Sequence, residues 1–214
     1  MTALPTLRTE RALLREAPGS LLAAVDEVGR GALAGPVAVG VVVLDAEVLP
    51  APRGVRDSKA CPPPLRHALA PRIRRWARAS AVGVASAEEI DAVGIVRALG
   101  IAAVRALNGL ACRPDIVLLD GSHDWIGRVS GGSRVVTRVK ADSTCAAVAA
   151  ASIIAKVHRD AVMESLAAAY PGYGWDANRG YAAPEHVAAL ARLGPSPLHR
   201  RSWRLPGLDA EAGA

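Results

Sequence analysis

LLAAVDEVGRG, residues 21–31, is the stretch of sequence from which the fold can be worked out. Residues 21–25 are continuously apolar, and a run of this length is typical of a strand buried on both faces. The run ends in two carboxylates, Asp26 and Glu27, and a glycine-rich turn follows. A second apolar run, rich in valine, covers residues 37–44. Two strands joined by a short glycine-containing loop predict a β-hairpin.

The rest of the chain mixes apolar runs with helical patterns. Further strands are expected at residues 81–85, 116–119 and 134–139. Helices are expected at 65–79, where Pro71 should start or kink the helix, at 94–110, from an N-cap at Ser143 or Thr144 to about 169, and at 184–193. Strands that come first and helices that come later predict a mixed α/β domain.

Composition limits the class of protein. The 214 residues carry 26 Lys and Arg against 20 Asp and Glu, and the net charge of +6 favours a polyanionic partner. Three widely spaced cysteines and five scattered histidines argue against a disulfide framework and a structural zinc site. No signal peptide and no membrane-spanning stretch is expected, so we predict a protein of the reducing cytoplasm.

Carboxylates recur where the predicted strands end. Asp26 and Glu27 close the first strand, and Asp120 and Asp142 follow two later ones. Ligand clefts of open α/β sheets form at the carboxyl ends of strands, so we expect the four acids to share one small volume. Divalent cations would relieve their repulsion, and oxygen ligands suit Mg²⁺ or Mn²⁺. Two such ions about 3.5–4 Å apart could activate a water and stabilise the leaving oxygen of a phosphodiester.

The positions of these acids raise two geometric expectations. Adjacent strand residues point to opposite faces, so Asp26 and Glu27 can reach one site only if the chain bends or ends its pleat there. Gly29 and Gly31 make such a bend possible. Asp142 stands just before the expected long helix, whose dipole favours the ionised carboxylate. The simpler alternative, that an acid merely ends a strand or caps a helix, stays open for any one of them.

Two loop segments could contact a nucleic acid. The glycines of Gly29-Arg30-Gly31 would let backbone amides approach a sugar–phosphate chain, although a simple hairpin loop needs glycines too. Ser58 and Lys59 could contact phosphate, although a loop lysine is often only solvated. Lys156 and Asp160 are four positions apart on a predicted helix, so a structural ion pair is expected there.

Aromatic residues gather near the C-terminal end. Tyr170, Tyr173, Trp175 and Tyr181 fall within twelve positions, close to several arginines. Aromatics next to cations in a loop suit stacking on sugars or bases together with phosphate contacts. We expect Tyr181, which follows a glycine, to face the substrate, and the other three to hold the C-terminal segment against the core.

Taken together, these motifs resemble the type 2 ribonucleases H, the ribonuclease HII family. The matching blocks stand in order over roughly residues 20–203: Asp26-Glu27-Val28-Gly29-Arg30-Gly31, Asp57-Ser58-Lys59, Asp120-Gly121, Ala141-Asp142, Ala150-Ala151-Ser152-Ile153-Ile154-Ala155-Lys156-Val157, Tyr173-Gly174-Trp175, Asn178-Arg179-Gly180-Tyr181 and His199-Arg200-Arg201-Ser202. The related ribonuclease HIII usually has Gly-Thr-Gly in the first block and an additional N-terminal domain, so Arg30 favours type HII.

The resemblance implies a fold and a division of the chain. It implies a ribonuclease H-like mixed sheet flanked by helices, with a small helical C-terminal extension. Residues 20–170 would form the catalytic domain and residues 171–204 the extension that contacts substrate. We expect residues 1–19 to be a polar leader, partly helical and otherwise flexible, and residues 205–214 to be a tail.

The resemblance also implies an activity and its residues. The family cuts the RNA strand of RNA–DNA hybrids and incises duplex DNA 5′ to embedded ribonucleotides, leaving 3′-hydroxyl and 5′-phosphate ends. It uses Mg²⁺ or Mn²⁺, and its four metal-binding acids correspond to Asp26, Glu27, Asp120 and Asp142. Its junction-sensing loop corresponds to residues 29–31, and its tyrosine that stacks on the following deoxyribose to Tyr181. We expect a monomer that starts the removal of misincorporated ribonucleotides, with recruitment by a replication clamp left open.

Two other classes are weighed against this resemblance. A ribonuclease H-like nuclease or strand-transfer enzyme acting on plain DNA would need the same acids. DNA, however, lacks the 2′-hydroxyl that Gly29-Arg30-Gly31 and Tyr181 would read. A non-catalytic nucleic-acid-binding module is supported only by the net charge and the arginines. Four carboxylates in a phosphate-binding cleft would weaken binding unless metal is present.

Overall fold

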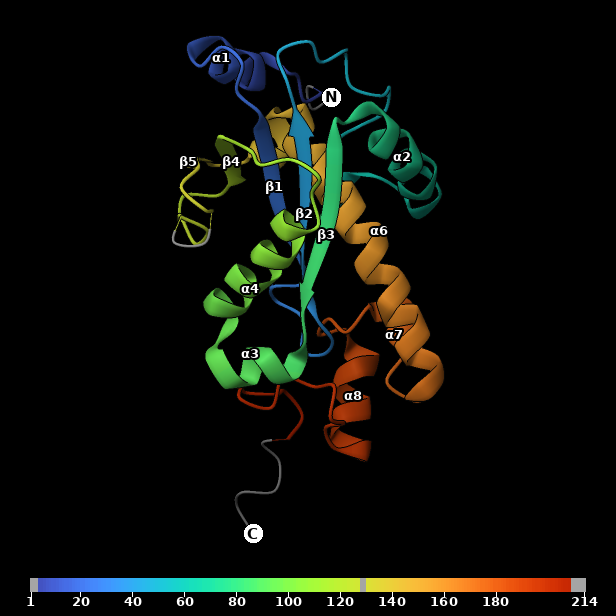
Figure 1. The fold of residues 1–214 in the computed structure, drawn as a ribbon. Coiled ribbons are helices and arrows are strands. Elements are labelled where there is room, and N and C mark those ends of the chain that lie inside the picture. The colour runs from blue at the N-terminus through green and yellow to red at the C-terminus, as the bar shows by residue number, and fades with distance from the viewer. Residues whose placement is uncertain (1–3, 128–129, 209–214) are drawn as a thin grey trace.

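A five-stranded mixed sheet, ordered β3-β2-β1-β4-β5, organises the molecule (Figure 1). The computed structural model describes residues 4–127 and 130–208. The strands are β1 (Leu22–Val28), β2 (Val37–Leu44), β3 (Ala79–Ala85), β4 (Ile116–Asp120) and β5 (Arg134–Arg138). β1 and β2 form the predicted antiparallel hairpin, β3 extends it, and β4 and β5 add in parallel on the other side of β1. The mixed α/β class is therefore confirmed.

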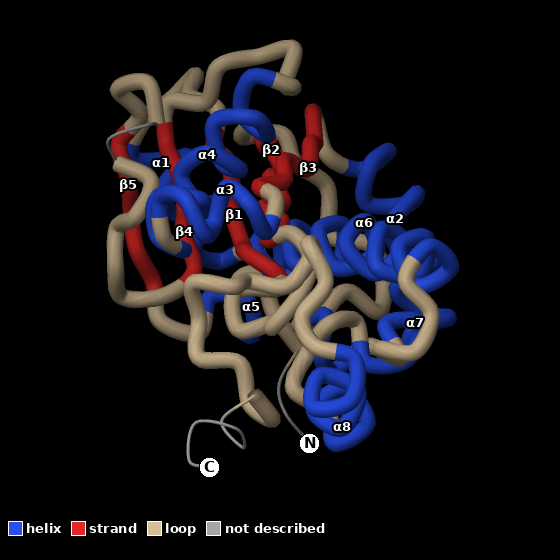
Figure 2. Tube along the Cα trace, turned by 90° about the horizontal axis from the view of Figure 1, so that it is seen from below, coloured by secondary structure: helices blue, strands red, loops and turns tan. Residues whose placement is uncertain are grey.

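Helices cover both faces of this sheet. In chain order they are α1 (Arg8–Glu16), α2 (Pro63–Trp76), α3 (Ala87–Val93), α4 (Ile95–Asn108), α5 (Ala141–Thr144), α6 (Ala146–Ala169), α7 (Trp175–Asn178) and α8 (Pro184–Leu193), with a 3₁₀ turn η1 at Ser58–Ala60. α4 lies in front of the sheet and the long helix α6 behind it (Figure 1). Figure 2 shows the strands from below, side by side from β5 to β3, with α8 beyond the sheet. Among the described helices, none is long and apolar enough to cross a membrane.

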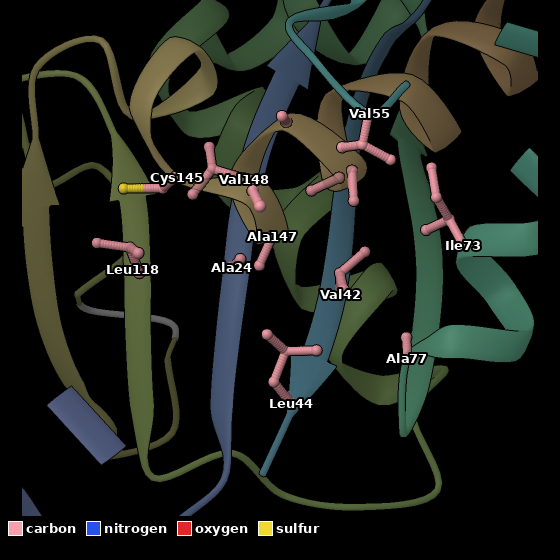
Figure 3. Close-up of a cluster of buried hydrophobic side chains, with 14 of the residues drawn as sticks. Ala24, Val42, Leu44, Val55, Ile73, Ala77, Leu118, Cys145, Ala147 and Val148 are labelled. Carbon is pink, nitrogen blue, oxygen red and sulfur yellow. The ribbon is translucent and has the colours of Figure 1, made fainter. Parts of the chain in front are cut away.

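The alternation of side chains along β1 divides the core into two layers. Leu22 and Ala24 pack with α6, α1 and α2, in the cluster drawn in Figure 3. Ala23 and Val25 pack on the opposite face, against α4. Both layers are apolar, which explains why the central strands appear in the sequence as continuous apolar runs. Burial on both faces fixes the register, so the end of β1 has a defined position.

Two glycines let the helices approach the sheet closely. A Cβ atom on Gly40 of β2 would overlap the carbonyl oxygen of Ala151 in α6. A Cβ atom on Gly83 of β3 would likewise overlap the carbonyl oxygen of Ala102 in α4. Each helix therefore rests on strand backbone at this point, and any larger residue would push it away from the sheet.

The expected polar leader does contain a helix, but this helix packs against the core instead of belonging to a flexible segment. Residues 8–16 form helix α1, whose Leu13 and Leu14 are buried in the core. The carboxylate of Glu10 is also buried and accepts a hydrogen bond of 2.8 Å from the backbone N–H of Ala147, at the start of α6. These contacts fix α1 to the rest of the molecule. Residues 1–3 and 209–214, at the ends of the predicted leader and tail, lie outside the described residues.

Two predicted helix starts were wrong, and α3 was not among the predicted helices. α2 begins at Pro63 and runs through Pro71, which lies inside the helix instead of starting it. α6 begins after Cys145, and neither Ser143 nor Thr144 is its N-cap. The first N–H groups of α6 donate to the Glu10 carboxylate in α1 and to the backbone carbonyl of Thr6, two residues before α1. A local sequence pattern cannot show such contacts. α3 was not predicted, although Ser86 and Glu89 form a complete capping box at its start.

Candidate active site

A cleft at the carboxyl end of β1 collects most of the predicted site residues. Its volume is about 410 Å³. Its lining consists of Asp26, Glu27, Val28, Gly29, Arg30, Gly31, Ser58, Lys59, Lys156 and Tyr181. Eight of these ten were predicted from the sequence to bind substrate or metal. The cleft therefore joins segments that are more than 150 positions apart in the chain.

Asp26 and Glu27 reach this cleft without the expected bend. The ladder between β1 and β2 continues through Val28, so the pleat is unbroken at both acids. The parallel ladder between β1 and β4, however, ends at the pair Val25–Leu119. Beyond that pair β4 no longer covers the edge of β1. Both acids can therefore line one cleft although their side chains leave opposite faces of the strand.

Asp120 and Asp142 are joined through the backbone. Asp120 ends β4, and its Oδ1 accepts hydrogen bonds from the N–H groups of Ala141 (2.6 Å) and Asp142 (3.3 Å). Asp142 lies in the first turn of the short helix α5, so the expectation that it directly precedes the long helix was wrong. Its own carboxylate accepts a hydrogen bond from the Ser143 hydroxyl at 3.1 Å. The Asp120 carboxylate at the end of β4 thus fixes the start of α5, the helix that carries Asp142.

Asp120 and Asp142 are not among the residues that line the cleft, but their charges act on the two acids that do line it. Burial raises the pKa of Asp26 well above its ordinary value, and the charges of Glu27, Asp120 and Asp142 raise it further. Burial also raises the pKa of Glu27, as does Asp120, although Arg30 opposes this with an ion pair of 3.5 Å. The pKa of Asp142 is raised by burial and then by Asp120. Without a cation, the cleft therefore holds carboxylates that disfavour one another's ionisation.

This donor set fits a hard divalent cation. Carboxylate oxygens are the ligands preferred by Mg²⁺ and Mn²⁺, and a cation would offset the repulsion that raises the pKa of Asp26. Across residues 4–127 and 130–208, no three Asp, Glu, His or Cys side chains already converge as a finished metal site. The fit therefore rests on the chemistry and mutual repulsion of the acids.

Two lysines bring positive charge to the cleft. Burial lowers the pKa of Lys59, but the carboxylates of Asp57, Asp142 and Asp26 outweigh it and raise the pKa overall. Lys156 forms the predicted ion pair with Asp160 at 2.5 Å. The prediction was incomplete, because Lys156 also lines the cleft. Its place in the block that resembles the ribonuclease HII family was the signal available in the sequence.

Tyr181 also lines the cleft, and two cationic side chains pack against its ring. Its ring centroid lies 5.2 Å from the guanidinium carbon of Arg159 and 5.9 Å from the Lys156 amine. Tyr173 and Trp175, in contrast, are buried and stacked on each other at 5.1 Å. This confirms that those two hold the C-terminal segment to the core, as does the half-buried Tyr170, which packs against Trp175. Tyr181 instead lines the cleft.

Carboxylates at the ends of neighbouring strands, beside a cleft that carries lysine and arginine, define a nuclease of the ribonuclease H-like class. The family model for ribonuclease HII matches residues 23–205, and the chain belongs to that family. The ribonuclease HII of Streptomyces avermitilis is 48% identical over 93% of this chain and 83% of that relative.

Solved structures agree with this assignment. The crystal structure of ribonuclease H2 from Pyrococcus horikoshii OT3 superposes with a TM-score of 0.70 and 29% identity, covering 86% of this chain and 94% of that one. The structure of Bst-RNase HIII in complex with Mn²⁺ gives a TM-score of 0.62 and 25% identity, covering 85% and 64%. The chain is thus an endoribonuclease, a hydrolase that acts on RNA–DNA hybrids and on ribonucleotide-containing DNA.

Proposed function

We propose that this ribonuclease incises on the 5′ side of a ribonucleotide, leaving 3′-hydroxyl and 5′-phosphate ends, with two divalent cations held by four acids. The placement of the acids supports the proposal: Asp26 and Glu27 line the cleft at the end of β1, and Asp120, at the end of the neighbouring strand β4, accepts a hydrogen bond from the N–H of Asp142. The same cleft contains the loop and the tyrosine that would recognise the ribonucleotide. Hydrolysis and recognition would therefore take place within one site.

The position of each of the four acids suggests its role in binding the metal ions or orienting the attacking water. Asp26 and Asp120, at the ends of adjacent strands, would bridge or flank the two ions. Asp142 would complete the second ion's ligands, and Glu27, held by Arg30, would orient the attacking water or one ion. Bound Mg²⁺ or Mn²⁺ would supply the positive charge that lowers the pKa of the attacking water and stabilises the leaving oxygen.

The other residues that line the cleft would select the substrate. The backbone of Gly29, Arg30 and Gly31 would read the ribose 2′-hydroxyl and the neighbouring phosphates, since this hydroxyl is what distinguishes RNA from DNA. Tyr181 would stack on the deoxyribose that follows. Ser58 and Lys59, both in the 3₁₀ turn η1, would contact phosphate. The ribonuclease would thereby begin the removal of ribonucleotides from DNA.

The setting of the activity is part of the proposal. We propose that the protein acts as a monomer in the cytoplasm, where Cys61, Cys112 and Cys145 stay reduced. All three are free thiols in the structure. Burial raises the pKa of the thiols of Cys61 and Cys145, so both are protonated and unreactive at neutral pH.

Substitution of single carboxylates tests the proposed chemistry. Asp26→Asn and Asp120→Asn should each reduce cleavage on the order of 10²–10³-fold or more, because each removes a charge that the reaction needs. Binding of the duplex should be retained, since neither residue is cationic. Cleavage rates and gel-shift affinities are measured beside Asp176→Asn, a matched change of an exposed acid in α7. Near-normal cleavage by either cleft variant would overturn the assignment.

A further inference from the structure

Two fully buried arginines lie beneath the cleft. Arg159 of α6 and Arg200 near the C-terminal end have no exposed surface. Neither forms an ion pair with a carboxylate in the described part of the chain, and both donate to backbone carbonyl groups instead. Burying a guanidinium without a counter-charge is unfavourable. Two such groups at one place therefore call for an explanation beyond packing.

Arg200 holds the loop at residues 29–31 from inside. Its guanidinium donates to the carbonyl oxygens of Gly29 (2.6 Å) and Arg30 (2.7 Å), and to that of Gly35 at 3.2 Å. The C=O and N–H of a trans peptide point in opposite directions. Carbonyls drawn inward therefore turn the N–H groups of Arg30 and Gly31 outward. Those two N–H groups have no hydrogen-bond partner among the described residues, so they remain available to a ligand.

Arg159 connects the same loop to Tyr181. Its guanidinium donates to the carbonyl oxygens of Ala34 (3.2 Å), Pro36 (2.8 Å) and Arg179 (2.9 Å). It also underlies the Tyr181 ring. Gly29 has a φ of +88°, and a Cβ atom there would overlap the Arg159 side chain. One guanidinium thus contacts both elements that would recognise the ribonucleotide.

We propose that Arg159 and Arg200 are positioning residues that set the loop at residues 29–31 and Tyr181 at a fixed spacing for reading a ribonucleotide. The inference rests on the proposed function of that loop and that tyrosine. Arg200 directs the two free N–H groups into the cleft, and Arg159 fixes the distance from them to the ring. Both arginines also place positive charge beneath a surface that receives phosphate. Burial and the neighbouring Arg159 lower the pKa of Arg200 to about 9, so it stays charged at neutral pH.

Lysine substitution separates position from charge. Lysine keeps a positive charge but cannot reproduce the planar fork that bonds several carbonyls at once. Arg200→Lys and Arg159→Lys should each lower incision at a single ribonucleotide roughly 10- to 100-fold, the scale expected for a misplaced binding group. Cleavage of a continuous RNA–DNA hybrid should fall much less, because it depends on the four acids and offers many binding registers.

The measurement is the ratio of the two cleavage rates, with circular dichroism and thermal unfolding recorded for each variant. The matched control is Arg201→Lys, the same change at the neighbouring arginine, whose side chain is exposed. A lowered ratio in both buried-site variants, with the control unchanged, supports the proposal. An unchanged ratio overturns it, and so does loss of the folded protein in both variants, because folding alone would then explain these arginines.

Gly31→Ala is measured in parallel to keep the two proposals apart. Beyond its chain neighbours, an added Cβ atom at Gly31 would meet no atom within 4 Å, so the variant should fold while its methyl group holds the ribose away from the backbone N–H groups. If Gly31→Ala lowers the ratio and the buried-arginine variants do not, the positioning role is wrong while recognition by the loop stands. If neither Gly31→Ala nor the buried-arginine variants change the ratio, recognition by the loop is wrong as well.

Discussion

At the scale of single residues, Tyr181 links the structure most directly to the choice of substrate. Its ring lies over Arg159 and Lys156 in the wall of the cleft, and the described structure shows no hydrogen bond between its hydroxyl and the four acids. Its contribution should therefore concern recognition of the sugar and not the chemical step. An aromatic ring that stacks on a nucleotide typically contributes about 1–3 kcal/mol.

We predict that Tyr181→Ala lowers incision at a single ribonucleotide by about 10- to 100-fold and lowers hybrid cleavage less. Tyr181→Phe keeps the ring and should lose much less than Tyr181→Ala. The test is the rate of each variant on both duplexes under identical conditions. Equal losses on both duplexes would assign Tyr181 to general binding or to folding.

The residues of the site differ in how well the sequence predicts them. Asp26 and Asp120 were predictable because a carboxylate directly after a buried apolar run is visible in the sequence. Arg159 and Arg200 were not predicted, since arginine is usually exposed and its burial depends on carbonyl groups contributed by distant segments. The sequence thus shows a carboxylate that follows an apolar strand, but it does not show which arginines become buried when the chain folds.

At the scale of elements, α1 and the start of α6 depend on each other. The Glu10 carboxylate accepts the Ala147 N–H, and the backbone of Thr6 accepts the Ala146 N–H at 3.0 Å. Burial raises the pKa of Glu10, and its second oxygen has no hydrogen-bond partner within the described chain. The cap of the longest helix is therefore supplied by a different element.

We predict that Glu10→Ala lowers the free energy of unfolding by about 1–2 kcal/mol, the usual effect of losing a helix cap. Glu16→Ala, on the exposed end of the same helix, should change it by less than about 0.5 kcal/mol. Urea unfolding of both variants and the parent chain provides the comparison. A Glu10→Ala protein as stable as the parent would show that α1 does not support α6.

The contact between α1 and α6 also explains why some helices could be predicted from the sequence and others could not. The five strands and helices α4, α6 and α8 follow from apolar runs and local spacing, because the residues that define them are neighbours in sequence. The start of α6 and the docking of α1 depend on a contact between residues 10 and 147. No local pattern contains that contact, so both predictions failed.

A chain of hydrogen bonds ties α8 to the loop before it. The backbone N–H of Ser196 donates to His199 Nδ1 at 2.9 Å, and the Nε2 atoms of His199 and His186 are 3.0 Å apart. His186 Nδ1 lies 2.8 Å from the carbonyl oxygen of Tyr181. These contacts are satisfied together when both rings are neutral. Burial, and then the neighbouring His186, lower the pKa of His199 to about 4.

The sign of the resulting pH dependence follows from that shift. Unfolded histidine titrates near its ordinary value of 6.5, so protons favour the unfolded chain between pH 6.5 and about 4. We predict that His199 contributes on the order of 2 kcal/mol of stability above this window, lost as the pH falls through it. The stability difference between the parent and His199→Gln should therefore shrink from pH 7 to pH 4.5. The difference for His67→Gln, an exposed control, should stay constant, and equal behaviour of the two variants would contradict the prediction.

At the scale of the whole molecule, two apolar layers hold one sheet, and the sheet sets where the site lies. The ends of β1 and β4 bring three acids to one edge, and the C-terminal segment closes the cleft from the other side with Tyr181. We therefore retain, as a proposal, the division into a catalytic part at residues 20–170 and a substrate-contacting part at residues 171–204.

Cleavage of three labelled duplexes tests most directly the claim that hydrolysis and ribonucleotide recognition share this cleft. The duplexes are all-DNA, DNA with one ribonucleotide, and an RNA–DNA hybrid, each with Mg²⁺, with Mn²⁺ and with chelator. We expect metal-dependent cutting of the hybrid and incision 5′ to the single ribonucleotide, with the all-DNA duplex intact. Cutting of the all-DNA duplex would contradict the recognition role of residues 29–31 and Tyr181, and cutting in chelator would contradict the role of the four acids.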